Sequence, residues 1–331
     1  MSDHYRIFGS ELSPYSVKVR AYFRYKQIPH EWLVRTRDNM AEFQKHAKLP
    51  LIPLVIPPEG QAMQDSTPII EKLEGPYPEP SIHPQDPTLT FLSALIEEYG
   101  DEWGNKQMFH YRWTYEADQE SAARRIAEDN APGASEQELE GVARMIRERM
   151  VPRLSFVGSS KKTRDQIESS YRRVLARLEA QLARRPYLFG ARPAFADFGL
   201  APQLYECGTD PTPAAILEAE APRVKAWAER MLDPKNEGEF ETWDALEPTL
   251  LPLLREEVAG LFLPWSDANA RALERGETEF SVELEGRSFS QNTQKYHAKS
   301  LAALRARYAA IPDKSRLDPI LEQASCLAWL S

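Results

Sequence analysis

A Ser-Pro-Tyr-Ser tetrapeptide at residues 13–16 combines residue types and a position that could do chemistry. It lies between an apolar run, Tyr5 to Phe8, and a stretch of helical character, Val17 to Arg24. A strand-to-helix turn of this kind points backbone N–H groups and the positive end of a helix dipole at a bound molecule, which favours a thiolate or a carboxylate. Because the tetrapeptide has no cysteine, it cannot perform dithiol chemistry, but it can hold the thiol of another molecule.

Three hydroxyl groups in this turn compete for contact with such a thiol. Ser13 is favoured because it stands at the helix terminus, where backbone N–H groups lack partners. Ser16 lies within the helix, where its side chain is expected to bond the preceding turn, and Tyr15 is expected to pack on a neighbouring helix. A purely structural interpretation also stands, since serine followed by proline is a common way to begin a helix.

Two downstream features accompany the tetrapeptide. Ile52-Pro53 precedes a short apolar run, 54–56, and Gln64-Asp65-Ser66 precedes a second helical stretch, 67–73. Taken alone, Asp65-Ser66 is equally consistent with a helix cap. Ile52-Pro53 alone does not indicate a cis bond, because few X–Pro bonds are cis. The order and spacing of all three features carry more information than any one of them.

The tetrapeptide resembles the Cys-Pro-Tyr-Cys motif of glutaredoxin-type chains with hydroxyls in place of sulfurs. The whole set resembles the amino-terminal, thioredoxin-like domain of the glutathione transferase superfamily. The resemblance implies that Ser13 contacts the glutathione sulfur, that Ile52 and a cis Pro53 pair with the cysteinyl backbone, and that Asp65 and Ser66 bind the γ-glutamyl end. Gln64 and Lys48 complete the expected glutathione-binding set.

The resemblance is incomplete at two positions. Many members carry a lysine just before the cis-proline dipeptide, for the glycyl carboxylate, and this chain has Leu51 there, with Lys45 and Lys48 as the nearest cations. The helical domain of the family has a capping motif in which a serine or threonine precedes an aspartate by three residues. Here Ala194 precedes Asp197, and we expect Asp197 to be structural.

The expected fold is an α/β thioredoxin-like domain, residues 1–75, followed by an all-α domain of glutathione transferase type, 88–245. Five prolines between residues 76 and 87 predict a linker. Strands are expected at 5–8, 31–34, 54–56 and 61–63, with a helix at 14–26. Beyond residue 245 we expect a mixed α/β extension to residue 331, with a hairpin that turns at Glu285-Gly286.

Aromatic residues after the linker suggest where a second substrate would bind. In the family this pocket lies between the domains and is lined by the first helices of the helical domain. The candidates are Tyr15, Trp103, Phe109, Tyr111 and Trp113. The alternative is that most of these side chains form core, because a stripe of aromatic residues at helical spacing usually faces inward.

Composition narrows the classes of function. The net charge of −9 argues against nucleic acid and anionic membranes as partners. The two cysteines exclude a disulfide framework, and the six histidines show no metal-ligand spacing, so no metal is expected. With no apolar segment at the start and no long apolar run, we expect a cytoplasmic protein without a membrane span.

The leading hypothesis is a glutathione transferase-like enzyme, homodimeric as the resemblance implies, that uses glutathione as co-substrate. It would activate the thiol for attack on a small apolar electrophile. The alternative is a glutathione-binding or non-catalytic scaffold protein with the same fold, which the missing lysine, the altered cap and the long extension favour. A thiol-dependent lyase or reductase is a third possibility, although reductases of the superfamily usually carry cysteine at the position of Ser13.

Overall fold

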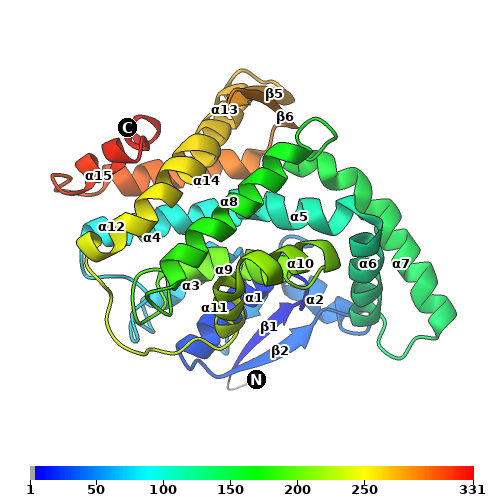
Figure 1. Ribbon diagram of the computed structural model, residues 1–331. Coiled ribbons are helices and arrows are strands. Elements are labelled where there is room, and N and C mark those ends of the chain that lie inside the picture. Colours follow the sequence, from blue (N-terminus) through cyan, green and yellow to red (C-terminus); the bar gives the residue numbers. More distant parts are fainter. Residues whose placement is uncertain (1–3) are drawn as a thin grey trace.

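The amino-terminal part is built around a mixed four-stranded sheet with the strand order β2-β1-β3-β4. The computed structural model, shown in Figure 1, describes residues 4–331. Strand β1 (Tyr5–Gly9) runs parallel to β2 (His30–Val34) and antiparallel to β3 (Leu54–Ile56), which pairs with β4 (Met63–Gln64). The helices are α1 (Pro14–Tyr25), α2 (Met40–His46) and α3 (Ser66–Glu74). This is the expected thioredoxin-like arrangement.

These strands could be predicted from short apolar runs and from alternating apolar and polar residues. Such patterns arise because one or both faces of each strand are buried. Ile7, Leu54 and Val55 are fully buried in the sheet. Strand β4 begins two residues later and ends one residue later than the strand predicted at 61–63. A strand of two residues carries too short a pattern to fix its ends. Residues 76–86 contain no helix or strand, as the prolines there require.

The second part is all helical. It comprises α4 (Pro87–Tyr99), the π-helical turn η1 (Gly100–Gly104), α5 (Asn105–Thr114), α6 (Glu116–Asn130), α7 (Glu136–Met150), the 3₁₀ segment η2 (Val151–Val157), α8 (Arg164–Leu182), α9 (Phe195–Cys207), α10 (Pro211–Glu220), α11 (Pro222–Arg230) and α12 (Trp243–Leu253). Helix α9 lies at its centre and packs on α4 and α1.

Asp197 fixes the start of α9, where Ala194 stands in place of a hydroxyl cap. Its carboxylate accepts hydrogen bonds from the backbone N–H groups of Ala194 and Leu188, at 2.8 and 2.9 Å, and from the indole N–H of Trp227 at 2.8 Å. Three donors at a fully buried carboxylate tie the start of α9 to the preceding loop and to α11. The structural role expected of Asp197 follows from these contacts.

The carboxyl-terminal extension is ordered and mixed in structure. Its elements are the π-helical segment η3 (Leu254–Phe262), α13 (Leu263–Glu274), the hairpin strands β5 (Glu279–Leu284) and β6 (Arg287–Asn292), α14 (Lys295–Ala309), α15 (Leu317–Gln323) and α16 (Leu327–Leu330). The hairpin turns at Glu285 and Gly286, whose φ angles are 51° and 71°, the left-handed conformations that a two-residue turn of this kind requires.

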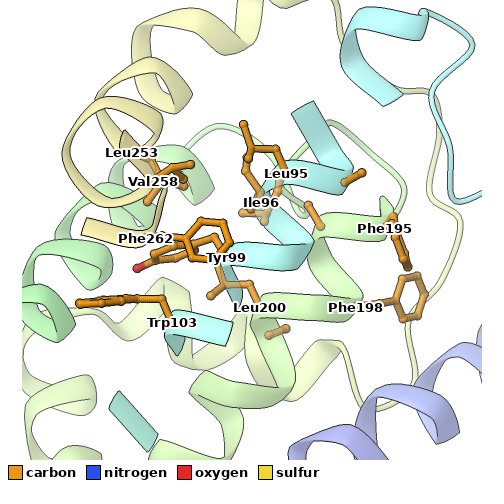
Figure 2. Packing of buried hydrophobic residues seen from close by; sticks show 14 of the residues in the cluster. Leu95, Ile96, Tyr99, Trp103, Phe195, Phe198, Leu200, Leu253, Val258 and Phe262 are labelled. Carbon is orange, nitrogen blue, oxygen red and sulfur yellow. The ribbon is translucent and has the colours of Figure 1, made fainter. Parts of the chain in front are cut away.

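One hydrophobic core joins the three parts of the chain. Figure 2 shows Tyr99 and Trp103 of the α4–η1 segment in one cluster with Leu200 of α9 and Phe262 of the extension. The rings of Tyr99 and Phe262 meet edge to face with centroids 6.2 Å apart. The extension therefore completes the core of the helical part and is not an appendage. Within residues 4–331 we find no helix with the length and apolar character needed to cross a bilayer.

Candidate functional site

The strand register brings the three sequence features to one end of the sheet. Phe8 near the end of β1 pairs with Leu54, the first residue of β3, and Leu54 pairs with Gln64 at the end of β4. The turn that leads to Ser13, the Pro53 that precedes β3, and the Asp65 that follows β4 must therefore lie at the same edge.

A cavity of about 580 Å³ opens at this edge. Its walls come from the loop before β3, from the end of β4, from the first two turns of α3, from Tyr15 of α1 and from Tyr296 of α14. Most of the lining is apolar, and the charged groups are Asp65, Lys48 and Lys72. Such a cavity suits a small molecule that carries charges of both signs.

Ser13 is the N-cap of α1, and its hydroxyl oxygen accepts the backbone N–H of Ser16 at 3.3 Å. Accepting this bond leaves the hydroxyl hydrogen of Ser13 available to another acceptor. Ser13 is half-buried, whereas Ser16 is fully buried and its hydroxyl makes no hydrogen bond within the described residues. The expectation that Ser16 bonds the preceding turn is therefore wrong.

Tyr15 reaches the cavity but uses its hydroxyl elsewhere. The hydroxyl donates to the backbone carbonyl of Asp101 at 2.9 Å, and burial raises the pKa of Tyr15 well above its ordinary value. Its phenol therefore stays protonated and engaged across the boundary between the two parts of the chain.

The peptide bond between Ile52 and Pro53 is cis, as the resemblance implies. Gln64 holds the loop in front of it. The Gln64 carboxamide accepts from the backbone N–H groups of Lys48 and Leu49, at 2.8 and 3.0 Å, and donates to the carbonyls of Leu49 and Leu51, at 2.8 and 2.7 Å. Gln64 lines the cavity, but these four bonds occupy its amide, so it shapes the loop and has no free donor for a ligand.

Asp65 stands immediately before α3 with a left-handed φ of 78°, a conformation that is costly for a residue other than glycine and often marks a functional position. Burial raises the pKa of the Asp65 carboxyl above its ordinary value, and a hydrogen bond from Tyr296 opposes this rise. Ser66 is the first residue of α3 and is buried. The carboxylate of Asp65 and the amino end of α3 thus share one side of the cavity.

A buried charge cluster supports this end of α3. The ammonium of Lys18 contacts Thr67 Oγ1 at 2.8 Å, Glu97 Oε1 at 2.5 Å and Asp101 Oδ2 at 2.6 Å, while Thr67 donates to Glu97 at 2.6 Å. Because Lys18 is nearly inaccessible to solvent, loss of any one carboxylate would leave a buried charge poorly compensated. This cluster was not predicted from the sequence, although a lysine on the apolar side of α1 is a signal for one.

The cations of the cavity are Lys48 and Lys72. Lys48 was expected from the sequence. Lys72 was not expected from the sequence. Its spacing of three residues from Ile69 on α3 nevertheless places the two residues on one helical face.

Four of the five aromatic candidates do not line the cavity. Trp103, Tyr111 and Trp113 are at most 1% exposed, so assigning them to a second-substrate pocket is wrong, and the core alternative holds for them. The indole N–H of Trp103 donates to Ser170 at 2.9 Å. Half-buried Phe109 packs on Trp113, with ring centroids 6.3 Å apart.

Two family models match parts of the chain. Residues 7–81 match a family model described as the glutathione S-transferase N-terminal domain, and residues 161–230 match the glutathione S-transferase C-terminal domain. No curated protein matches the chain.

Solved structures similar to the chain include three glutathione transferase-like proteins. A GST-like protein from Pseudomonas syringae is 17% identical over 70% of this chain and 67% of its own, with a TM-score of 0.45. A Tau class glutathione S-transferase from mango, Mangifera indica, is 18% identical over 76% of this chain and 100% of its own, with a TM-score of 0.44. A glutathione S-transferase from Methylobacillus flagellatus, solved with glutathione bound, is 19% identical over 69% of this chain and 94% of its own, with a TM-score of 0.42.

Proposed function

Because the chain belongs to the glutathione transferase superfamily, we propose that it binds glutathione in the cavity beside α3 and activates the thiol for attack on an apolar electrophile. The observation that carries this proposal is the meeting of the Ser13 turn, the cis Ile52–Pro53 bond and the Asp65-Ser66 pair at one edge of the sheet, next to a cavity of suitable size.

The charges of the cavity complement those of glutathione, which has one ammonium and two carboxylates. The carboxylate of Asp65 would bind the γ-glutamyl ammonium, and the amino end of α3 at Ser66 would bind the neighbouring carboxylate. The backbone of Ile52 would pair with the cysteinyl residue. Lys48, with Lys72 nearby, would bind the glycyl carboxylate and so replace the lysine that is absent at the position of Leu51.

The chemistry requires the thiolate form of glutathione. A free cysteine thiol has a pKa of about 8.5, and lowering it by two units needs about 2.7 kcal/mol of preferential stabilisation of the thiolate. A hydrogen bond from the Ser13 hydroxyl and the dipole of α1 are suitable sources. The thiol loses its proton to solvent, the sulfur forms a bond to an electrophilic carbon, and the electron pair passes to a leaving group or to the acceptor.

A non-catalytic glutathione-binding or scaffold function remains the second candidate. The observation in its favour is that this chain has Leu51 where many members of the family carry a lysine for the glycyl carboxylate of glutathione. Bound glutathione with no turnover of any electrophile would support this candidate. Homodimerisation and a cytoplasmic location are further parts of the family-based proposal, and analytical ultracentrifugation would test the former.

The deciding experiment is thermal unfolding with reduced glutathione. At a hundredfold excess over its Kd the ligand should stabilise the protein by about 2.7 kcal/mol, seen as a rise in Tm. Asp65→Ala should abolish the rise, because the ammonium loses its counter-charge. Asp38→Ala is the matched control, since Asp38 is exposed and outside the cavity, and it should keep the full rise. No rise for the unmodified protein at millimolar glutathione would refute the proposal.

A further inference from the structure

The carboxyl-terminal extension contributes a side chain to the cavity. Tyr296 is the second residue of α14 and lines the cavity together with residues of the loop before β3. Its hydroxyl lies 2.9 Å from Asp65 Oδ1 and 3.0 Å from Oδ2. The two residues are 231 positions apart in the sequence, so this contact depends entirely on how the extension docks.

Helix α14, which carries Tyr296, is anchored along its length to other elements. Arg307 forms an ion pair with Glu71 of α3. His297 contacts Glu102 of η1, and Ser300 donates to Glu98 of α4. The leucines of the helix, Leu301 and Leu304, are buried between these contacts. The helix is therefore anchored by contacts that do not depend on a ligand, and it presents Tyr296, whose side chain is half exposed, to Asp65.

The geometry of the contact leaves Asp65 able to bind a second donor. The Tyr296 hydroxyl lies nearly equidistant from the two carboxylate oxygens, and a carboxylate has about four acceptor positions. The backbone N–H of Ser66 also acts on this carboxylate. Two donors do not use all four acceptor positions, so the carboxylate can still accept from an ammonium. The phenol also opposes the effect of burial on Asp65, which favours the charged carboxylate that such an ammonium needs.

We propose that Tyr296 is a positioning residue for recognition of the γ-glutamyl ammonium, and that the extension is for this reason part of the glutathione site. The inference rests on the proposed function. Tyr296 orients the Asp65 carboxylate through its hydroxyl, so Asp65 and the extension together recognise the free amino group of the ligand.

The test compares glutathione with glutaryl-cysteinyl-glycine, which has the same thiol and carboxyl ends but lacks the amino group. Calorimetric titration of full-length Tyr296→Phe should give a Kd for glutathione about three- to tenfold weaker than that of the unmodified protein, the loss expected for one hydrogen bond. The Kd for the deaminated ligand should not change. Adding Tyr296→Phe to Asp65→Asn should cause no further loss, because the two residues act as one unit.

Tyr308→Phe provides the matched control. It removes a hydroxyl from the same helix, at a position where the phenol donates to Asp318 at 2.8 Å and does not reach the cavity. Both ligands should bind this variant as they bind the unmodified protein, and circular dichroism should show both variants folded.

Each other outcome overturns the inference in a recognisable way. If Tyr296→Phe bound both ligands equally more weakly, Tyr296 would only shape the cavity wall. If the variant bound glutathione more tightly, Tyr296 would compete with the ammonium for Asp65. Unchanged glutathione binding in Tyr296→Phe would refute this inference alone. Failure of the unmodified protein to bind glutathione would refute the proposed function and this inference with it.

Discussion

The hydroxyl of Ser13 serves two purposes that a single substitution can separate. As an acceptor it caps α1 through the N–H of Ser16, and as a donor it is free to bind a thiolate. Loss of a cap costs about 1 kcal/mol of stability, whereas loss of a charge-assisted hydrogen bond costs about 1.5 to 3 kcal/mol. The first loss appears in unfolding and the second in the ionisation of bound glutathione.

We therefore predict that Ser13→Ala raises the pKa of the thiol of bound glutathione by about one to two units. The ultraviolet absorbance of the thiolate, titrated against pH, measures this shift. The Kd for glutathione should change little. Conjugation at neutral pH should fall accordingly. Ser13→Thr, which keeps the hydroxyl, should restore the titration. Ser16→Ala is the control, because Ser16 is fully buried. A shift in the control but not in Ser13→Ala would assign the role to Ser16.

A site residue could be predicted from the sequence only where neighbouring residues form a recognisable pattern with it. Ser13, Pro53 and Asp65 each stand at the junction of a strand with a helix or turn, and such junctions have short sequence signatures. Tyr296 has none, because only the docking of α14 brings it to Asp65. Lys18 could be noticed as a charge on an apolar helix face, but its partners Glu97 and Asp101 lie 79 and 83 residues away.

At the scale of elements, helices α4 and α9 approach until their backbones touch. A Cβ atom on Gly199 of α9 would lie 2.7 Å from the Cα atom of Glu97, and a Cβ atom on Gly100 would lie 2.8 Å from the Cα atom of Leu200. Reciprocal glycines thus allow the contact that sets the centre of the helical part, the region drawn in Figure 2. Backbone atoms stand at both points, and they cannot move aside as the end of a flexible side chain can.

We predict that Gly199→Ala destabilises the protein by about 1–3 kcal/mol, the usual cost of overpacking, even though alanine favours a helix. Gly141→Ala is the control. Gly141 lies within α7, where a Cβ atom would meet no other atom within 4 Å, so this variant should gain about 0.5–1 kcal/mol. Urea denaturation measures both. Stabilisation by Gly199→Ala would show that the two helices separate without cost.

The same close packing explains why the aromatic stripe was hard to interpret from sequence. The segment from α4 to α5 is covered on nearly every side, by α9, by α8 and by the extension. Lys106, Gln107 and Arg112 are buried there together with Trp103 and Tyr111. A helix that is buried on all sides has no solvent-facing side. The pattern of apolar and polar residues along it therefore cannot distinguish a ligand pocket from the core.

At the scale of the whole molecule, acidic groups mark the place where the three parts of the chain meet. Glu98 of α4 accepts a hydrogen bond from Ser300 of the extension, and Glu97 and Asp101 bind Lys18 of the amino-terminal part. Glu102 and His297 lie in the same region. Burial, reinforced by the charge of Glu97, raises the pKa of Glu98 to about 8.

This arrangement predicts a specific dependence of stability on pH. Between pH 4.5 and 8, folded Glu98 holds a proton that the unfolded chain has released, so its contribution to the free energy of unfolding falls as pH rises through that range, by up to about 1.4 kcal/mol per pH unit. Glu98→Gln cannot ionise and keeps a similar shape, so it should lack this loss. Urea denaturation at pH 5, 7 and 9 should therefore show the variant gaining stability over the unmodified protein as pH rises. A difference that stays constant across the three pH values would show that Glu98 is charged in the folded protein, with Lys18 and Ser300 compensating for its burial.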